Sequence, residues 1–286
     1  MSDHFLSSYR QVLQLPEGCA GDLWRRSAYG KRHRPHAHEE IELNFVLRGS
    51  ASYLLRRRRY DMRAGALVWL FPDQDHVLID ESADFEMYIL VVAPGALAHA
   101  GGDARYAALL QRDPDGDFCR TLPGDEQARI ERLLAQVADA RAEPARFNPG
   151  LAFAALTCWR AFGDAPPAPP PRAVHPAVDK AARLLVAGDR DEDLAALAAA
   201  CGLSIGRLSR LFHAQIGLTL PAFRNRQRLT RYAALRERRP DMNATQAAYE
   251  AGFGSYAQFY KMYRAARGVG PAGDAASEIP KRVPIK

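Results

Sequence analysis

Three side chains that bind metal ions readily lie close together in the segment HAHEEIE, which spans residues 36–42. They are His36, His38 and Glu42. If this segment is one extended strand, all three point to the same side of a sheet, because successive side chains of a strand alternate. Imidazole and carboxylate groups on one face are ligands for a divalent ion, or hydrogen-bond partners for a polar organic molecule. The spacing therefore predicts a polar binding site.

The sequence around these residues resembles a known metal-binding pattern. Residues 30–49, GKRHRPHAHEEIELNFVLRG, resemble the first cupin motif, and residues 65–76, GALVWLFPDQDH, resemble the second. The second match is looser, because the spacing around Pro72 is shifted and the usual glycine before the histidine is absent. The resemblance implies a barrel interior lined by His36, His38 and Glu42, with His76 as a fourth ligand. Such a set suits a divalent transition metal, but the same groups could bind an organic effector or be ordinary core histidines.

Short runs with strand character surround this site, separated by turn residues. Between residues 20 and 95 they include Ile41–Leu47, Ala51–Leu55, Ala66–Phe71 and Phe85–Val92. Closely spaced strands without an intervening helical period predict an antiparallel barrel or sandwich. Residues 104–163 follow, and apolar residues at helical spacing over 125–141 and 147–162 predict two amphipathic helices. These helices either cover the barrel or pair between subunits, and we expect a homodimer.

A different kind of chemistry is predicted from Asp191 to Gly217. The pattern is typical of two short helices joined by a tight turn, with Asp191 capping the first helix, Gly202 at the turn and Ser204 capping the second. Small, polar and cationic groups on the exposed face of the second helix suit the major groove of DNA. The candidate DNA-binding residues of this helix are Ser204, Gly206, Arg207, Ser209, Arg210 and His213.

The same pattern returns between Asn243 and Arg267. Asn243 resembles the start of a capping box, Gly252 falls at the turn, and Ser255 begins a second candidate recognition helix. Two such patterns in tandem predict a DNA-binding domain with two helix-turn-helix motifs rather than a helical hairpin that arose by chance. The candidate DNA-binding residues of the second helix are Ser255, Tyr256, Ala257, Gln258, Tyr260 and Lys261.

The segment between the two units predicts a connecting helix that starts after the cap Thr219 and ends before Pro240. At about 28 Å it would hold the recognition helices near the spacing of successive major grooves. Residues 175–271 as a whole resemble the DNA-binding domain of AraC/XylS transcription regulators, through LAALAAACGLSIGRLSRLFHAQIG, RQRLTRYAAL and AAYEAGFGSYAQFYKMYR ahead of Gly270-Pro271. The chain departs from that family after Pro271, where AGDA replaces the usual Tyr-Arg pair.

Charge is distributed unevenly along the chain. The whole sequence has 39 Lys/Arg and 33 Asp/Glu, and residues 173–286 hold 18 and 10 of these, a net charge of +8 against −2 for the remainder. An excess of positive charge in one region is expected of a polyanion-binding domain. The four cysteines form no CxxC pair, and neither a signal peptide nor a long apolar span is evident, so we expect a cytoplasmic protein.

These observations predict a multidomain α+β protein. Residues 1–165 would form an antiparallel, cupin-like β-barrel with flanking helices, residues 166–172 a proline-rich linker, residues 173–272 an all-α double helix-turn-helix domain, and residues 273–286 a flexible tail. We expect a transcription regulator, not an enzyme, that binds double-stranded DNA and an unknown small molecule, and that contacts RNA polymerase if it is an activator. The alternatives are a metal-dependent cupin enzyme tethered to nucleic acid, and an effector-independent DNA binder with a degenerate barrel.

Overall fold

The computed structural model describes residues 9–28, 34–168, 170–188 and 193–271. The chain divides into two compact units, the first built mainly from the residues up to Ala173 and the second from Val174 onward. The predicted cap Asp191, the residues after Pro271 and the first glycine of the cupin-like motif, Gly30, lie outside the described residues.

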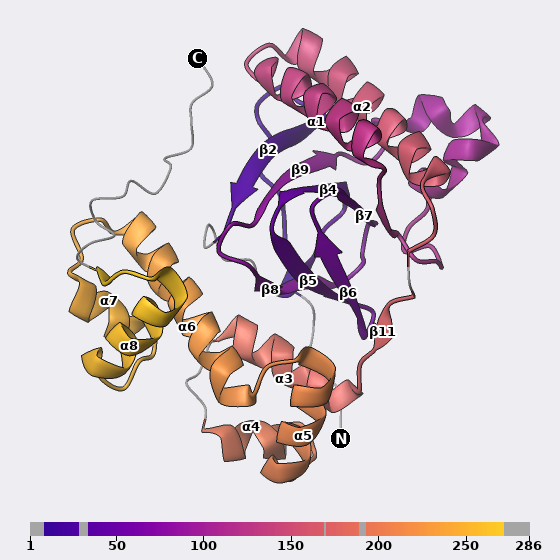
Figure 1. The fold of residues 1–286 in the computed structure, drawn as a ribbon. Coiled ribbons are helices and arrows are strands. Elements are labelled where there is room, and N and C mark those ends of the chain that lie inside the picture. The colour runs from indigo at the N-terminus through magenta and orange to yellow at the C-terminus, as the bar shows by residue number, and fades with distance from the viewer. Residues whose placement is uncertain (1–8, 29–33, 169, 189–192, 272–286) are drawn as a thin grey trace. The chain divides into compact units, whose positions relative to one another are not determined.

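Two β-sheets form the centre of the first unit (Figure 1). One has the strand order β1-β3-β8-β5-β6-β11 and the other β10-β7-β4-β9-β2. The strands of the six-stranded sheet are β1 (Tyr9–Arg10), β3 (His36–Ala37), β8 (His76–Glu81), β5 (Ser50–Leu55), β6 (Arg58–Arg63) and β11 (Arg172–Ala173). Those of the five-stranded sheet are β10 (Cys119–Thr121), β7 (Ala66–Leu70), β4 (Ile41–Arg48), β9 (Glu86–Val92) and β2 (Gly21–Ser27).

The predicted antiparallel architecture is confirmed, with one refinement. Apart from the parallel pair β1–β3, the strands pair in antiparallel fashion. Within the described residues no ladder joins the two sheets, so the barrel is not closed by hydrogen bonds. Strand β11 lies at the end of the proline-rich segment that we expected to be only a linker, and it pairs with β6.

Alternation along β4 separates two hydrophobic clusters. Leu43 and Phe45 point to one side, where they pack with residues of α1 (Gly124–Asp139) and α2 (Pro144–Asp164). Val46 points to the other side, into a cluster with residues of β5, β7 and β9. Figure 1 shows α1 and α2 lying over the five-stranded sheet. The two predicted helices therefore cover one face of the barrel, and the opposite face of the same sheet lines its interior.

The segment between β9 and β10 contains two short 3-10 helices, η2 (Ala98–Gly102) and η3 (Ala104–Leu110). Trp159 of α2 donates its indole N–H to the carbonyl of Arg105, at 2.7 Å. Arg120 of β10 donates to the carbonyl oxygens of Phe162, Gly163 and Ala165 at the end of α2. The last carbonyl oxygens of a helix lack an intrahelical donor, and Arg120 supplies a cationic donor to those of α2, which stabilises the end of this helix.

In the part of the second unit that the structure describes, the regular elements are all helices. Its helices are α3 (Pro176–Ala187), α4 (Leu194–Ala200), α5 (Ile205–Ile216), α6 (Leu220–Arg238), α7 (Ala244–Glu250) and α8 (Tyr256–Arg267). Helix α6 packs against α3 and α5 at one end and against α7 and α8 at the other. No single helix in the described part of the chain is long and apolar enough to cross a membrane, and α4 with α5 reach that length and composition only as a pair bent by 84°.

Candidate metal centre and nucleic-acid interface

The structure brings the three predicted histidine ligands of the cupin-like site together in the interior of the first unit, with Glu42 in contact with His38. His36 lies on β3, His76 on β8 and Glu42 on β4, while His38 lies in the turn between β3 and β4. All four side chains are buried. One potential ligand nitrogen from each of the three histidines lies within 4.8 Å of the other two. This is a spacing at which one ion could contact all three rings.

One expectation about this site is wrong. His36, His38 and Glu42 do not share one strand, because the chain bends at Glu39 and Glu40 and passes from the six-stranded sheet to the five-stranded sheet. His36 pairs directly with His76 in the six-stranded sheet, whereas Glu42 pairs with Leu70 and Val91 in the other. The ligands therefore come from both sheets, and the site depends on how the sheets face each other.

Backbone carbonyls determine which nitrogen of two histidines carries a proton. Nδ1 of His38 lies 3.0 Å from the carbonyl oxygen of Glu40, and Nδ1 of His76 lies 2.9 Å from that of Gln74. A carbonyl oxygen only accepts, so each Nδ1 is the donor and each Nε2 is left to face the site. Nε2 of His38 lies 3.1 Å from Oε2 of Glu42. Nε2 of His76 is buried without a hydrogen-bond partner among the described residues.

The charges within the cluster follow from burial and from these contacts. Burial lowers the pKa of His76, and the neighbouring His36 lowers it further, to about 3, so this ring is neutral at ordinary pH. Burial also opposes protonation of His38, but the hydrogen bond and charge of Glu42 outweigh it and raise the pKa of His38. For Glu42, burial would raise the pKa, but the hydrogen bond with His38 and the nearby histidines hold it well below its usual range.

Two further buried side chains that the sequence analysis did not single out support Glu42. Asn44 donates from Nδ2 to Oε1 of Glu42 at 2.7 Å and to the hydroxyl oxygen of Tyr53 at 3.2 Å. The ring of Tyr53 lies edge-on to His76, with 6.2 Å between ring centroids. Asn44 follows Glu42 by two residues on β4, so strand parity alone would have placed it on the same face.

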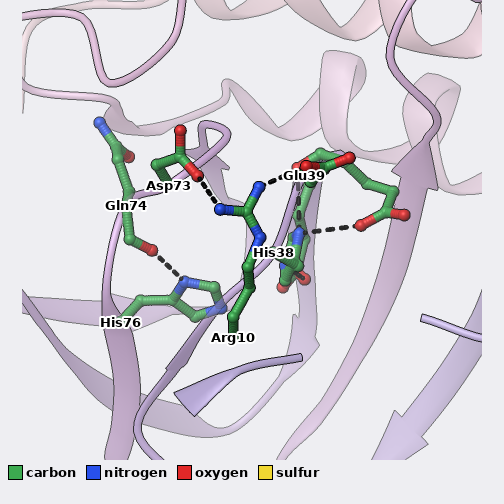
Figure 2. Close-up of polar contacts among 8 residues, drawn as sticks. Arg10, His38, Glu39, Asp73, Gln74 and His76 are labelled. Atoms are coloured by element: carbon green, nitrogen blue, oxygen red, sulfur yellow. Dashed lines mark hydrogen bonds and ion pairs between the residues drawn. The ribbon is translucent and has the colours of Figure 1, made fainter. Parts of the chain in front are cut away.

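Charged residues lie beside His38 and His76, as Figure 2 shows. Arg10 of β1 forms ion pairs with Glu39 and Asp73. Asp73 also accepts a hydrogen bond of 2.6 Å from Nε of Arg112. Glu39 directly follows His38 in the chain, and Asp73 directly precedes Gln74. Arg10 therefore connects the two loops that hold His38 and His76 in place.

The first helix-turn-helix unit has the geometry that the sequence predicts. Gly202 lies at the turn with φ +70°, and the axes of α4 and α5 differ by 84°. Ser204 caps α5, since its hydroxyl oxygen accepts from the backbone N–H of Arg207 at 3.4 Å. Leu208 and Phe212 are fully buried on the inner face of α5. On the opposite face Ser204, Gly206, Arg207, Arg210 and His213 are exposed and Ser209 is half-buried.

The second helix-turn-helix motif repeats this arrangement, but two of its candidate DNA-binding residues are half-buried. Gly252 lies at the turn with φ +95°, and Ser255 caps α8 by accepting from the backbone N–H of Gln258 at 3.2 Å. Ser255, Ala257, Tyr260 and Lys261 are exposed, as predicted. Tyr256, which we expected to face outward, is half-buried and packs with Phe259, with 5.5 Å between ring centroids. Gln258 is also half-buried.

The two helix-turn-helix motifs lie at opposite ends of the predicted connecting helix. Helix α6 spans 19 residues from Leu220 to Arg238. Thr219 caps it by accepting from the backbone N–H of Ala222 at 3.3 Å, and Pro221 occupies its first turn. A 19-residue helix is about 28 Å long, close to the repeat of successive major grooves. The fold and its two capped recognition helices define a regulator with a DNA-binding domain and a separate sensor domain.

Comparison with known protein families agrees with this class. Residues 21–157 match an AraC-like ligand binding domain, and residues 178–274 match a helix-turn-helix domain. The two matches together cover most of the chain, and the chain belongs to the AraC family. It is a DNA-binding transcription regulator whose N-terminal domain senses a small molecule.

The solved structures to which this chain is similar are distant from it in sequence. ToxT from Vibrio cholerae is 13% identical, with a TM-score of 0.39, over 91% of this chain and 98% of its own. A ToxT structure with an unsaturated fatty acid bound is 12% identical, with a TM-score of 0.38, over 88% and 93%. The AraC-like transcriptional activator CuxR is 17% identical, with a TM-score of 0.32, over 75% of each chain. A comparison with curated proteins gave no significant match.

Proposed function

We propose that the sensor domain of this regulator binds a divalent transition metal through His36, His38, His76 and Glu42. The observation that carries the proposal is the convergence of three buried imidazoles, with a ligand nitrogen of each within 4.8 Å of the others. Nε2 of His76 is neutral, buried and without a described partner, an arrangement that leaves a polar atom unsatisfied in the metal-free protein. A bound ion would satisfy it.

The chemistry of the four side chains fits such an ion. Imidazole nitrogen and carboxylate oxygen together suit zinc, nickel or iron rather than calcium or magnesium, which prefer oxygen alone. The Nδ1 atoms of His38 and His76 are held by backbone carbonyls, and such outer hydrogen bonds commonly orient metal-binding histidines. When bound, the metal would supply positive charge and a coordination position for an oxygen or nitrogen atom of an organic effector.

We infer that the site is sensory rather than catalytic. A general base needs a carboxylate or imidazole that can reach a substrate proton. In this cluster both carboxylate oxygens of Glu42 are occupied, one by His38 and the other by Asn44. These contacts favour a regulator over the alternative of a metal-dependent enzyme tethered to DNA.

For the DNA-binding domain, we propose that α5 and α8 enter the major groove. Arg210 lies on the exposed face of α5, where a guanidinium can pair with guanine, while Arg207 in the first turn is placed for phosphate. On α8, Gln258 can pair with adenine, and Lys261 is the exposed cation nearest to it. The remaining contacts would come from Ser204, Gly206, Ser209, His213, Ser255, Tyr256, Ala257 and Tyr260.

We further propose that the protein acts in the cytoplasm as a homodimer formed through α2. Phe153 lies on the outer face of this helix and is 62% exposed, while Leu156, one turn along, is only partly buried. A large exposed aromatic residue beside other apolar groups is typical of a protein interface. If the protein activates transcription, its further partner is RNA polymerase.

Metal analysis of the purified protein tests the central proposal. We expect about one equivalent of zinc, nickel or iron per chain, removable by a chelator, and none in His38→Ala. We also expect DNA binding to change when the metal is removed. If no metal is found and His38→Ala still abolishes the response to an organic metabolite, the cluster binds that metabolite instead. If the substitution alters neither metal content nor any response, the four side chains are structural.

A further inference from the structure

Beneath the histidine cluster lies a pair of buried polar side chains, Asn44 and Tyr53. Asn44 is fully buried, and Tyr53 is 5% exposed. They lie in different sheets, Asn44 on β4 and Tyr53 on β5, and meet in the interior of the first unit. Burying a polar group is unfavourable unless it forms hydrogen bonds. Tyr53 packs in a hydrophobic cluster with Val46, Val68 and Ile89, so the polar contacts of the pair call for an explanation.

The contacts of the pair lead to two of the four candidate ligands. Nδ2 of Asn44 donates to Oε1 of Glu42 at 2.7 Å, while Oε2 of the same carboxylate faces His38 at 3.1 Å. Nδ2 also donates to the hydroxyl oxygen of Tyr53 at 3.2 Å. The ring of Tyr53 lies edge-on to the ring of His76, with an interplanar angle of 77°. One pair thus contacts Glu42 from one sheet and His76 from the other.

These contacts give the two carboxylate oxygens of Glu42 different roles. A carboxylate that is free to rotate can offer a metal one oxygen or both. Here Oε1 accepts from the amide of Asn44 at 2.7 Å, while Oε2 lies 3.1 Å from Nε2 of His38. Hydrogen bonds from outside the ligand set orient metal ligands, and their loss typically lowers metal affinity by about 10–100-fold.

We propose that Asn44 and Tyr53 are positioning residues, which restrict Glu42 to a single donor oxygen and so determine the coordination geometry and metal preference of the site. This inference rests on the metal site proposed above. Without the amide donor of Asn44, Oε1 is free to turn toward the ion, and the coordination number changes. Tyr53 acts one step further out, because its hydroxyl contacts Asn44 rather than Glu42.

The test is titration of the metal-free full-length protein with Co²⁺, whose visible absorption depends on coordination number and ligand type. The variants are Asn44→Leu, which removes the amide at similar size, and Tyr53→Phe, which removes only the hydroxyl. The matched control is Ser52→Ala. Ser52 neighbours Tyr53 on β5 and is also buried, but its hydroxyl bonds to Asp61 at 2.7 Å, outside the cluster. Thermal unfolding of each variant establishes that it is folded.

We expect Asn44→Leu to weaken Co²⁺ binding by about 10–100-fold and to change the shape and intensity of the visible spectrum. Tyr53→Phe should change the spectrum in the same direction with a smaller loss of affinity. Ser52→Ala should leave both unchanged, even if it lowers thermal stability. A role in packing alone would lower stability without moving the spectrum.

Two results would overturn the inference, and they differ from each other. If the unsubstituted protein binds Co²⁺ and the spectra of Asn44→Leu and Tyr53→Phe match its spectrum, Asn44 and Tyr53 do not position Glu42, and the metal site itself stands. If the unsubstituted protein shows no Co²⁺ absorption at all, the proposed metal site is wrong, and the positioning role is lost with it.

Discussion

Replacing His76 by leucine separates two contributions to the free energy of unfolding: the unfavourable burial of His76 in the metal-free protein and the stabilisation by a bound metal. In the metal-free protein, Nε2 of His76 is buried without a described partner, a situation that costs about 1–3 kcal/mol. Leucine removes this cost. It also removes the hydrogen bond of 2.9 Å to the carbonyl of Gln74, worth about 0.5–1.5 kcal/mol. The two changes largely offset each other, so we expect His76→Leu to be as stable as the unsubstituted protein in chelator, or slightly more stable.

With zinc present the outcome should reverse. A ligand at 100 times its Kd stabilises the protein that binds it by about 2.7 kcal/mol, which raises the Tm of a domain of this size by roughly 5–10 °C. His76→Leu lacks one of the four ligands and should lose most of this gain. The assay is thermal unfolding of the N-terminal domain with and without zinc, using His99→Leu as the control, because His99 is exposed and does not belong to the cluster.

The reasoning would be refuted by either of two results. One is a loss of stability in His76→Leu that is equally large in chelator and in zinc, which would show that the histidine is an ordinary, satisfied core residue. The other is an equal stabilisation of His76→Leu and the unsubstituted protein by zinc, which would place the metal elsewhere.

Three further predictions concern pH, DNA and assembly. The pKa of His38 is raised above 6.5, and a metal must displace the proton on its Nε2, so zinc affinity should fall by about tenfold per pH unit below that raised pKa. The stability of the metal-free domain has the opposite pH dependence. The part of it that protonated His38 contributes is complete below pH 6.5 and is lost as pH rises through the raised pKa. A pH-independent zinc Kd between pH 8 and 5 would contradict this. Arg210→Ala should cost about 1–3 kcal/mol and relax one or two base preferences in a selection from random DNA, whereas Arg207→Ala should weaken all sequences alike and reduce the salt slope by about 1; an unchanged sequence preference in Arg210→Ala would show that it reads no base. Phe153→Asp should raise the dimer Kd by about tenfold or more in sedimentation experiments, and an unchanged Kd would move the interface away from α2.

Local features of the DNA-binding domain could be predicted from the sequence because they depend on neighbouring residues. Two such features are a glycine in a left-handed turn and a serine that caps a helix by accepting from the backbone N–H three residues further on. Both depend only on a short segment of the chain. Gly202 and Gly252 have the positive φ values, and Ser204 and Ser255 form the caps. The half-burial of Tyr256 was missed because it results from packing against the ring of Phe259, and the types of the two residues alone do not predict that packing.

The histidine cluster shows where such reasoning stops. Strand parity placed Glu42 on the same face as the two histidines, and the resemblance to a cupin made that face the interior. The assumption of one continuous strand was wrong, because the bend at Glu39 and Glu40 divides the ligands between two sheets. The partners that meet through this bend, such as Asn44 with Tyr53, belong to different sheets. No periodicity within a single strand carries information about which residue of another sheet it will face.

The pairing of β1 with β3 has a practical consequence for handling the protein. Tyr9 lies opposite His36, and Arg10 joins the loops beside His38 and His76. An affinity tag fused just ahead of Tyr9 would therefore be attached to a strand that borders the cluster. A polyhistidine tag there would add competing imidazoles beside the cluster, and its purification on immobilised nickel could load the cluster with that metal. A histidine-free tag at the other end of the chain keeps metal analysis interpretable.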